Sequence, residues 1–139
     1  MERKWFTPGE ANELLPRIKA ELEVLQRLAN SIERRFAELQ RIKTSSVHAL
    51  TDLPTEADPL FELEAQLEFM RMEADMLVGN FARKGVLLKM IEPALVDFPS
   101  VLDGEPVLLC WKEGEDGVSH YHGWNEGFAG RRALPEEWK

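Results

Sequence analysis

The residues best suited to chemistry lie near the C-terminus, in the segment HYHGWNEGFAGRR that runs from His120 to Arg132. On a β-strand, His120 and His122 would share one face, about 7 Å apart at a rise of ~3.4 Å per residue. Two imidazoles placed in this way can bind one ion, so the pair predicts a site for a divalent metal such as zinc. A third ligand would have to come from water, from Cys110 across the hairpin, or from Glu115, Asp116 or Glu126. Without it, the two histidines would face solvent or bond to nearby carboxylates.

A second interpretation places His122 in a polar cluster with Glu115 and Arg131, where a small ligand would bind. A carboxylate on a hairpin loop can approach a histidine on the returning strand, and an arginine beyond the glycine-spaced turn can reach back to both. Arginine binds carboxylates through two parallel hydrogen bonds. The alternative is that these residues only hold the C-terminal loop in place, with Phe128 packed in the core, the glycines forming a turn and an arginine paired with the acidic second helix.

Motifs of well-known enzyme classes are missing from the sequence. It contains neither the Gly-x-Ser-x-Gly of serine hydrolases nor the His-Glu-x-x-His of zinc peptidases. The one cysteine, Cys110, precedes Trp111 in an apolar run, and this context predicts a buried thiol that is not activated as a nucleophile. The sequence therefore assigns no enzyme class.

Two long helices are predicted to precede this segment. Apolar residues recur at alternating spacings of three and four from Leu15 to Leu39, and again from Leu60 to Phe81. The stretch Thr7-Pro8-Gly9-Glu10 predicts a capping box at the start of the first helix, and Asp58-Pro59 predicts the start of the second. Residues 44–58 are rich in Ser, Thr, Asp and Pro, which predicts a connecting loop. The matched seams predict an antiparallel, coiled-coil-like helical hairpin over residues 8–83.

From residue 85 onward the apolar residues fall in short runs that are typical of β-strands. The clearest run is VLLCW at residues 107–111, and the glycine-rich loop at 113–117 leads into a returning strand at 118–122. This pattern predicts a small antiparallel sheet of three or four strands within residues 85–139. We therefore expect one α+β domain over residues 1–139.

The second helix carries more apolar surface than one neighbouring helix can cover. A further stripe, displaced from the heptad seam, consists of Ala65, Phe69, Met72 and Met76. Stripes of this kind are usually buried. Either the C-terminal part of the same chain or a second copy must cover it, and we expect a homo-oligomer formed through the helices.

Composition and charge exclude several classes of partner. The net charge is −8 and no concentrated basic patch is visible, so we expect no nucleic-acid partner. No apolar run approaches the roughly 18 residues of a membrane span, and the opening MERKWFTPGE lacks the apolar core of a signal peptide. A single cysteine allows no internal disulfide, which is typical of the reducing cytoplasm.

Three stretches of the sequence resemble an uncharacterised bacterial domain-of-unknown-function family, the one numbered twenty-two-oh-three. They are FTPGEANELLPRIK, LVDFPSVLDGEPVLLCWKEGE and YHGWNEGFAGRR. The family usually places an aromatic residue and a histidine at the positions of Tyr121 and His122, whereas His120 falls outside its pattern. The resemblance implies the fold and a bacterial cytosol, and it implies a polar cluster of Glu115, His122 and Arg131 beside the sheet. It brings no ligand or activity with it.

These observations favour a non-enzymatic, self-associating interaction or scaffolding protein. The alternative is an enzyme that binds a small ligand or a divalent metal, with its site on the C-terminal sheet around His122.

Overall fold

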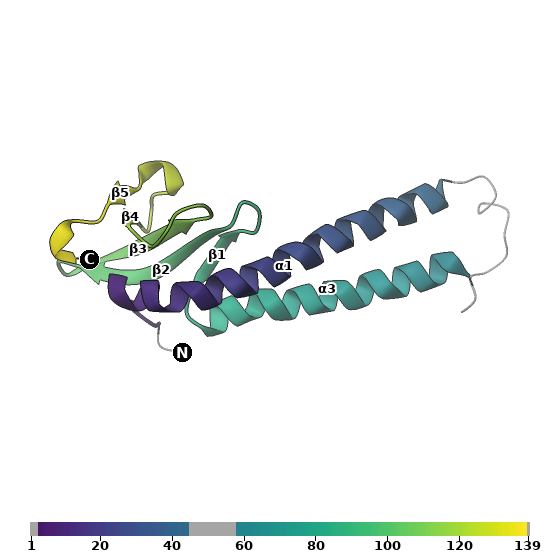
Figure 1. The fold of residues 1–139 in the computed structure, drawn as a ribbon, viewed down its shortest axis with the longest axis horizontal. Coiled ribbons are helices and arrows are strands. Elements are labelled where there is room, and N and C mark those ends of the chain that lie inside the picture. The colour runs from purple at the N-terminus through teal and green to yellow at the C-terminus, as the bar shows by residue number, and fades with distance from the viewer. Residues whose placement is uncertain (1–2, 45–57, 139) are drawn as a thin grey trace. The chain divides into compact units, whose positions relative to one another are not determined.

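The computed structural model describes residues 3–44 and 58–138, which form two α-helices followed by a five-stranded antiparallel sheet (Figure 1). The helices are α1 (Pro8–Lys43) and α3 (Pro59–Arg83). The strands, in both chain and sheet order, are β1 (Leu87–Met90), β2 (Leu95–Leu102), β3 (Glu105–Lys112), β4 (His120–Gly123) and β5 (Arg132–Ala133). This order confirms the predicted α+β class. Neither described helix is both long and apolar enough to cross a lipid bilayer.

Both helices begin at N-caps that the sequence predicts. The hydroxyl of Thr7 accepts a 3.1 Å hydrogen bond from the N–H of Glu10, and the Glu10 carboxylate accepts one of 2.9 Å from the N–H of Thr7. This reciprocal pair is the capping box. At α3, the carboxylate of Asp58 accepts a 2.8 Å bond from the N–H of Leu60. The connection predicted over residues 44–58 lies, apart from its two end residues, outside the described residues.

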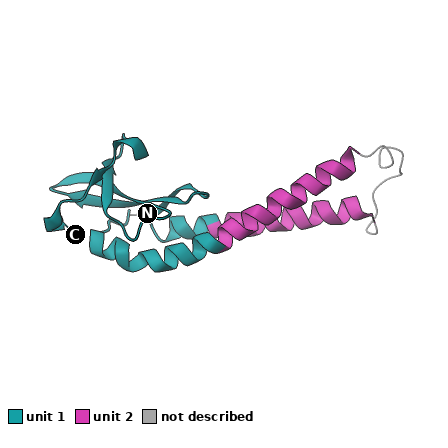
Figure 2. Ribbon diagram, turned by 45° about the horizontal axis from the view of Figure 1, so that its top comes forward, with its two compact units in different colours: residues 1–23, 78–139 teal, residues 24–77 magenta. Residues whose placement is uncertain are grey.

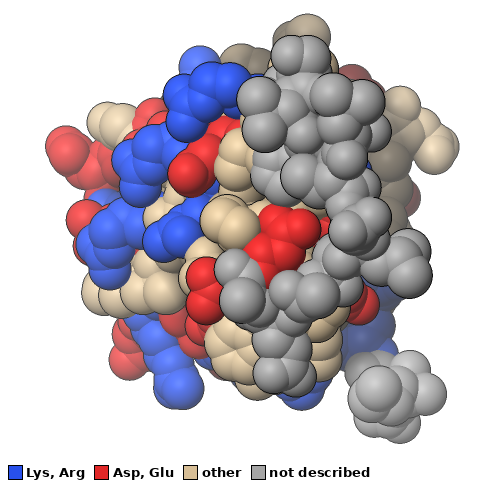
Figure 3. Space-filling model, turned by 90° about the vertical axis from the view of Figure 1, so that its right-hand side faces the viewer, with Lys and Arg blue, Asp and Glu red and all other residues tan. Residues whose placement is uncertain are grey.

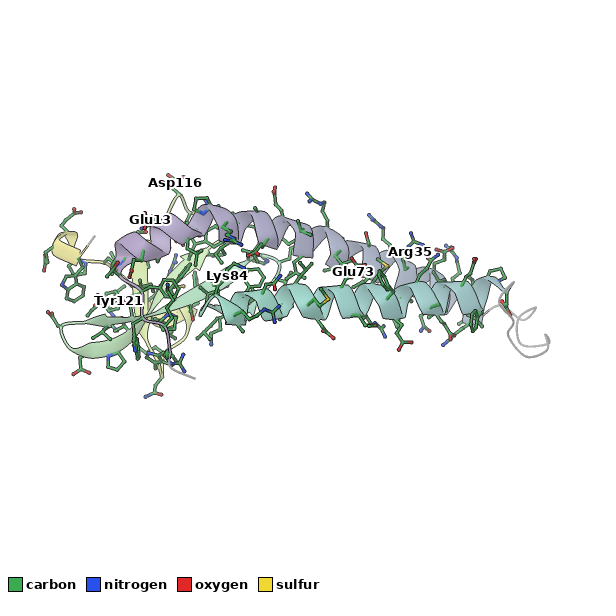
Figure 4. The ribbon with its side chains drawn as sticks, turned by 90° about the horizontal axis from the view of Figure 1, so that it is seen from below. Glu13, Arg35, Glu73, Lys84, Asp116 and Tyr121 are labelled. Atoms are coloured by element: carbon green, nitrogen blue, oxygen red, sulfur yellow. The ribbon has the colours of Figure 1, made fainter. Side chains whose placement is uncertain are left out.

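Contacts divide the chain into two compact units, which Figure 2 shows in different colours. One unit, residues 24–77, contains the adjoining parts of α1 and α3. Its core consists of apolar residues from both helices, namely Leu39, Leu63 and Leu67, with Ile32, Ile42 and Leu60 packed against them. Arg35, labelled in Figure 4, donates a 2.6 Å hydrogen bond to Gln66 across the two helices. The two seams therefore face each other in this unit, while coiled-coil packing stays a prediction.

The other unit, residues 1–23 and 78–139, contains the sheet and the remaining parts of the helices. One face of the sheet is apolar and meets α1. Lys19 of α1 lies over the ring of Trp111, with its Nζ 5.5 Å from the ring centroid, and Phe6 packs edge-on against Phe98 at 5.4 Å. The buried residues of this face are Val96, Phe98, Leu109 and Trp111. Because this face of the sheet is buried and apolar, the polar side chains lie on the opposite face.

The register of the sheet decides which side chains meet on that opposite face. Asp97 of β2 lies opposite Cys110 of β3, which in turn lies opposite His120 of β4. Two residues along, Leu108 lies opposite His122. Since directly opposed residues of an antiparallel sheet project to the same side, all of these side chains share the face that points away from α1.

The sheet has five strands, whereas the sequence predicts three or four. The additional strand, β5, consists of Arg132 and Ala133, which pair with Tyr121 and His120. Two residues are too few to show an alternation of polar and apolar side chains, so this strand is defined by its backbone pairing alone. The short 3-10 helix η1 (Phe128–Gly130) leads into it.

Candidate functional site

Three buried side chains with metal-binding atoms converge on the sheet face that points away from α1. They are Asp97 of β2, Cys110 of β3 and His122 of β4, and one ligand atom from each lies within 4.8 Å of the other two. Their exposed fractions are 2%, 0% and 3%, so bulk water hydrates none of them. A carboxylate, a thiol and an imidazole buried together must satisfy one another or bind a further group.

The three side chains can converge because β3, which carries Cys110, lies between β2 and β4 in the sheet. Asp97 and Cys110 are direct partners in the β2–β3 ladder, whereas His122 lies two residues along β4 from the partner of Cys110. The imidazole therefore approaches from a diagonal position. Its Nε2 lies 3.2 Å from Oδ2 of Asp97, so the two side chains meet beside the Cys110 thiol.

The protonation of the His122 ring follows from its second hydrogen bond. Nδ1 lies 2.9 Å from the carbonyl oxygen of Gly123, which can only accept, so Nδ1 carries the hydrogen of that bond. In a neutral ring Nε2 is then an acceptor, and it faces Asp97, whose ionised carboxylate also only accepts. Two such acceptors need a cation between them, either a proton or a metal ion. Metal-binding histidines are commonly oriented in this way by a backbone carbonyl.

Asp97 has an oxygen that its surroundings leave unsatisfied. Its Oδ1 is buried and has no hydrogen-bond partner among the described residues. Burial raises the pKa of Asp97 above its ordinary value, while the neighbouring His122 opposes this rise. An ionised carboxylate at this depth is unfavourable unless a positive charge lies beside it. The free oxygen is therefore a position where a cation would bind favourably.

The thiol of Cys110 is buried, as the sequence predicts. Burial raises the pKa of the Cys110 thiol to about 12, and the negative charge of Asp97 adds to the rise. Such a thiol stays protonated at neutral pH and is a poor nucleophile. A metal ion would change this, because a coordinating thiol gives up its proton. The guanidinium of Arg131 interacts with the same thiol and favours its ionised form.

Glu115 and Arg131, which were predicted to share a cluster with His122, form a bidentate ion pair. The two terminal nitrogens of Arg131 lie 3.0 and 2.6 Å from the two carboxylate oxygens of Glu115. Partial burial raises the pKa of Glu115, but the hydrogen bonds from Arg131 lower it. The pKa of Glu115 therefore lies below its ordinary value. His122 contacts Asp97, and the charge of Arg131 lowers the pKa of the neighbouring Cys110 thiol against the larger effect of burial. Direct contact joins Glu115 with Arg131, and a shared ligand site of these two residues with His122 stays a prediction.

His120, the other half of the predicted metal-binding pair, lies next to the buried group. It is the direct partner of Cys110 in the β3–β4 ladder. Its Nδ1 lies 3.0 Å from the hydroxyl of Ser119 and 3.8 Å from Oε2 of Glu115. The converging ligand atoms include those of His122 and not those of His120. Joint binding of one ion by the two histidines stays a prediction.

Phe128 does not pack in the core, contrary to one of the predictions. Its side chain is 37% exposed. The guanidinium of Arg131 lies 4.2 Å from its ring centroid, and Nζ of Lys112 lies 5.1 Å from the same centroid. Cation–π contacts of this kind hold an aromatic ring at a surface without burying it.

Asp97 is the member of the buried group that sequence reasoning missed. The available signal was an acidic residue in the middle of the apolar run LVDFP, where a charge is unfavourable without a partner. Alternation along a strand indicates which face a side chain occupies, but it does not identify the residue opposite. The partnership of Asp97 with Cys110 and His122 therefore required the register of three strands.

Comparison with known proteins identifies a family. The family model described as uncharacterized conserved protein (DUF2203) matches residues 4–134. The chain therefore belongs to this family, in agreement with the resemblance of its motifs. No curated protein and no solved structure matches the chain.

Proposed function

We propose that the protein binds a zinc ion through Asp97, Cys110 and His122. The observation that carries the proposal is the meeting of two acceptors, Nε2 of His122 and Oδ2 of Asp97, at 3.2 Å in a buried site. The second carboxylate oxygen there has no hydrogen-bond partner among the described residues. A divalent cation would satisfy both residues and displace the proton of the nearby thiol.

Distances and donor types support zinc as the ion. Zinc binds thiolate sulfur at about 2.3 Å and nitrogen or oxygen at about 2.0–2.2 Å, so ligand atoms around a tetrahedral ion lie roughly 3.3–3.8 Å apart. The three ligand atoms lie within 4.8 Å of one another, so only a small contraction is needed on binding. One sulfur, one nitrogen and one oxygen donor suit zinc better than calcium or magnesium, which prefer oxygen ligands.

His120 is the residue we assign as the fourth ligand. It lies directly opposite Cys110 in the sheet and so shares its face, and binding the ion would require its Nδ1 to give up the contact with Ser119 or its Nε2 to bind instead. Four protein ligands are typical of structural zinc sites, whereas catalytic sites keep one position open to water. The proposed role of the ion is therefore to tie β2, β3 and β4 together, with Arg131 favouring the thiolate.

The same geometry has a competing explanation without metal, in which Asp97 keeps a proton and donates it to Nε2 of His122. The raised pKa of Asp97 is consistent with such a shared proton. Under this explanation the purified protein holds no stoichiometric metal, and added zinc leaves the melting temperature unchanged. Under the zinc proposal, elemental analysis finds about one zinc per chain and removal of the ion lowers the melting temperature.

Three single substitutions should each remove zinc binding, namely Asp97→Asn, Cys110→Ser and His122→Ala. Each should weaken the affinity by more than the roughly 10- to 100-fold that loss of an outer hydrogen-bond partner causes. Asp103→Asn is the matched control, since it makes the same chemical change on an exposed turn. Unchanged zinc affinity in all three ligand variants would overturn the proposal.

Cobalt(II) in place of zinc adds a spectroscopic test of the thiol. A thiolate bound to cobalt produces a charge-transfer absorption that an alcohol ligand does not. Cys110→Ser should lose this band, while His120→Ala should keep it and bind zinc more weakly than the wild type. If His120→Ala binds zinc as tightly as the wild type, water occupies the fourth position and the assignment of His120 is wrong.

Self-association through α3 is a second candidate function, favoured by an exposed apolar stripe. The stripe consists of Phe61, Phe69, Met72 and Met76. Phe69, Met72 and Met76 are 63%, 60% and 69% exposed, so the described residues of the unit formed by residues 24–77 leave most of each side chain accessible to solvent. Exposed apolar side chains that share one side of a helix commonly mark an interaction site.

Charge supports a second copy of the chain as the partner of this stripe. Within residues 59–77, α3 carries five acidic side chains and one arginine. Within residues 24–43, α1 carries five basic and two acidic side chains. A neighbouring molecule can therefore present a basic helix to an acidic one. Figure 3 shows Lys and Arg side chains mostly on the left of the face that it draws, with Asp and Glu side chains among them.

Sedimentation analysis of the full chain tests self-association. At tens of micromolar, the wild type should sediment as a dimer or a larger oligomer, and Phe69→Gln with Met72→Gln should shift it toward monomer. Met90→Gln is the matched control, because it replaces an exposed methionine on β1. A wild type that stays monomeric at this concentration would exclude the candidate.

Both candidate functions are compatible with the predicted cytoplasmic location. Cys110 is the single cysteine of the sequence and must stay reduced to bind a metal ion. The reducing cytoplasm keeps thiols in this state.

A further inference from the structure

A pocket of about 170 Å³ opens on the same face of the sheet as the buried cluster. Its walls are Met90, Pro93, Leu95, Lys112 and Phe128. Leu95 lies opposite Lys112 in the β2–β3 ladder, two residues along from the pair of Asp97 and Cys110. At strand spacing this separation is about 7 Å, so the pocket is distinct from the proposed zinc ligands and adjacent to them.

The walls of the pocket are mostly apolar and partly open to solvent. Four of the five wall residues are apolar, and two of these, Met90 and Phe128, are 48% and 37% exposed. A concave surface with exposed apolar side chains gains free energy when an apolar group covers it. Small-molecule sites commonly combine such walls with a few polar groups that fix the orientation of the ligand.

Positive charge lies at one side of the pocket. Lys112 and Arg131 both contact the ring of Phe128, at 5.1 and 4.2 Å from its centroid. Arg131 is neutralised by its bidentate pair with Glu115. Lys112 forms no ion pair with any carboxylate of the described residues. Its ammonium is therefore the charge that an incoming ligand would meet.

We infer that this pocket binds a small monocarboxylate with a short apolar tail. The tail would cover Met90, Leu95 and Phe128, and the carboxylate would pair with Lys112. One negative charge matches one ammonium, whereas a phosphate ester would need further donors, such as the N-terminus of a helix, that these walls do not supply. The volume holds roughly five or six water molecules at ~30 Å³ each, which limits the tail to a few carbon atoms.

The inference is independent of the zinc proposal, and its test uses metal-free protein. Hexanoate and hexan-1-ol are suitable probes, since they share the apolar tail and differ in charge. Titration of the full ¹⁵N-labelled chain with hexanoate should shift the backbone amide resonances of Met90, Leu95, Lys112 and Phe128. Hexanoate should bind about fivefold more tightly than hexan-1-ol, as expected for one partly exposed ion pair.

Two lysine variants decide whether Lys112 causes this preference. Lys112→Gln should bring the affinities of the two probes to within about twofold, because it removes the ion pair and keeps the apolar walls. Lys89→Gln is the matched control, since it removes a positive charge from an exposed position on the neighbouring β1. Equal binding of the two probes by the wild type, or an unaltered preference in Lys112→Gln, would overturn the inference. So would resonance shifts that map away from the pocket.

Discussion

The imidazole of His122 and the carboxylate of Asp97 meet at 3.2 Å although their strands, β4 and β2, are separated by β3. Neighbouring strands lie about 4.8 Å apart, so side chains two strands apart can touch only if both lean over the strand between them. The residue of β3 at this place is Cys110, whose small side chain allows the contact. The pair therefore spans three strands, and whatever cation joins it also joins the strands.

Zinc affinity should rise with pH. The Cys110 thiol, with its pKa raised to about 12, is protonated in the free protein at neutral pH and must lose that proton to bind zinc. Loss of one proton on binding makes the affinity rise about tenfold per pH unit. At lower pH, where the carboxyl of Asp97 with its raised pKa is also protonated, the dependence should become steeper. Competition with a chelator at several pH values measures this slope.

If the Asp97→Asn variant still binds zinc weakly, the change of its zinc affinity with pH provides a check on that slope. It should retain the dependence that arises from Cys110 and lose the steeper part at low pH, because its side chain no longer binds a proton. An affinity that does not change with pH would contradict a thiolate ligand.

Replacing Glu115 with Gln should destabilise the protein at neutral pH and have little effect in acid. The pKa of Glu115 is lowered on folding, so its ionised form stabilises the native state above the ordinary value of 4.5. That contribution is lost as the pH falls through the lowered pKa. We expect a loss of about 1.5–3 kcal/mol at pH 7, the range for hydrogen bonds to charged groups.

Urea unfolding of wild type and Glu115→Gln at pH 7 and below pH 4 measures the difference. Glu105→Gln, an exposed glutamate at the start of β3, is the control and should change stability little at either pH. A loss of equal size at both pH values would show that the charge of Glu115 is not its cause.

Replacing either Leu25 or Leu67 with Ala should lower the free energy of unfolding by about 2–5 kcal/mol, the range for truncation of a buried leucine. The two side chains are 1% and 3% exposed in the unit formed by residues 24–77. Leu14→Ala is the control, since Leu14 is only partly buried and should matter less. Chemical unfolding measures the losses, and melting within about a degree of the wild type for both variants would rule out this packing.

Replacing Thr7 with Ala should cost about 0.5–2 kcal/mol, because α1 loses the side chain that caps its N-terminus. The Thr7 hydroxyl accepts a hydrogen bond from the N–H of Glu10, which would otherwise lack a partner within the helix. Thr7→Ser keeps a hydroxyl at the same place and should retain most of the stability. Equal losses in the two variants would mean that the methyl group of Thr7, and not its hydroxyl, is responsible.

Much of the fold could be predicted because its signals are local. The capping box at Thr7 and the start of α3 after Asp58 were readable from neighbouring residues. Heptad spacing identified the apolar seams, since side chains three and four residues apart lie on one face of a helix. The two-residue strand β5 escaped prediction because it is too short to carry a pattern.

The sequence by itself determined the helices, the main strands and the burial of the Cys110 thiol, because each depends on spacing and composition over a few residues. It also indicated His122, Glu115 and Arg131 as candidates for a polar site. Only the tertiary structure decided that His122 meets Asp97 and that Arg131 meets Glu115. The first pair depends on the register between strands, which leaves no trace in the spacing along one strand, and the second depends on how two loops fold against each other.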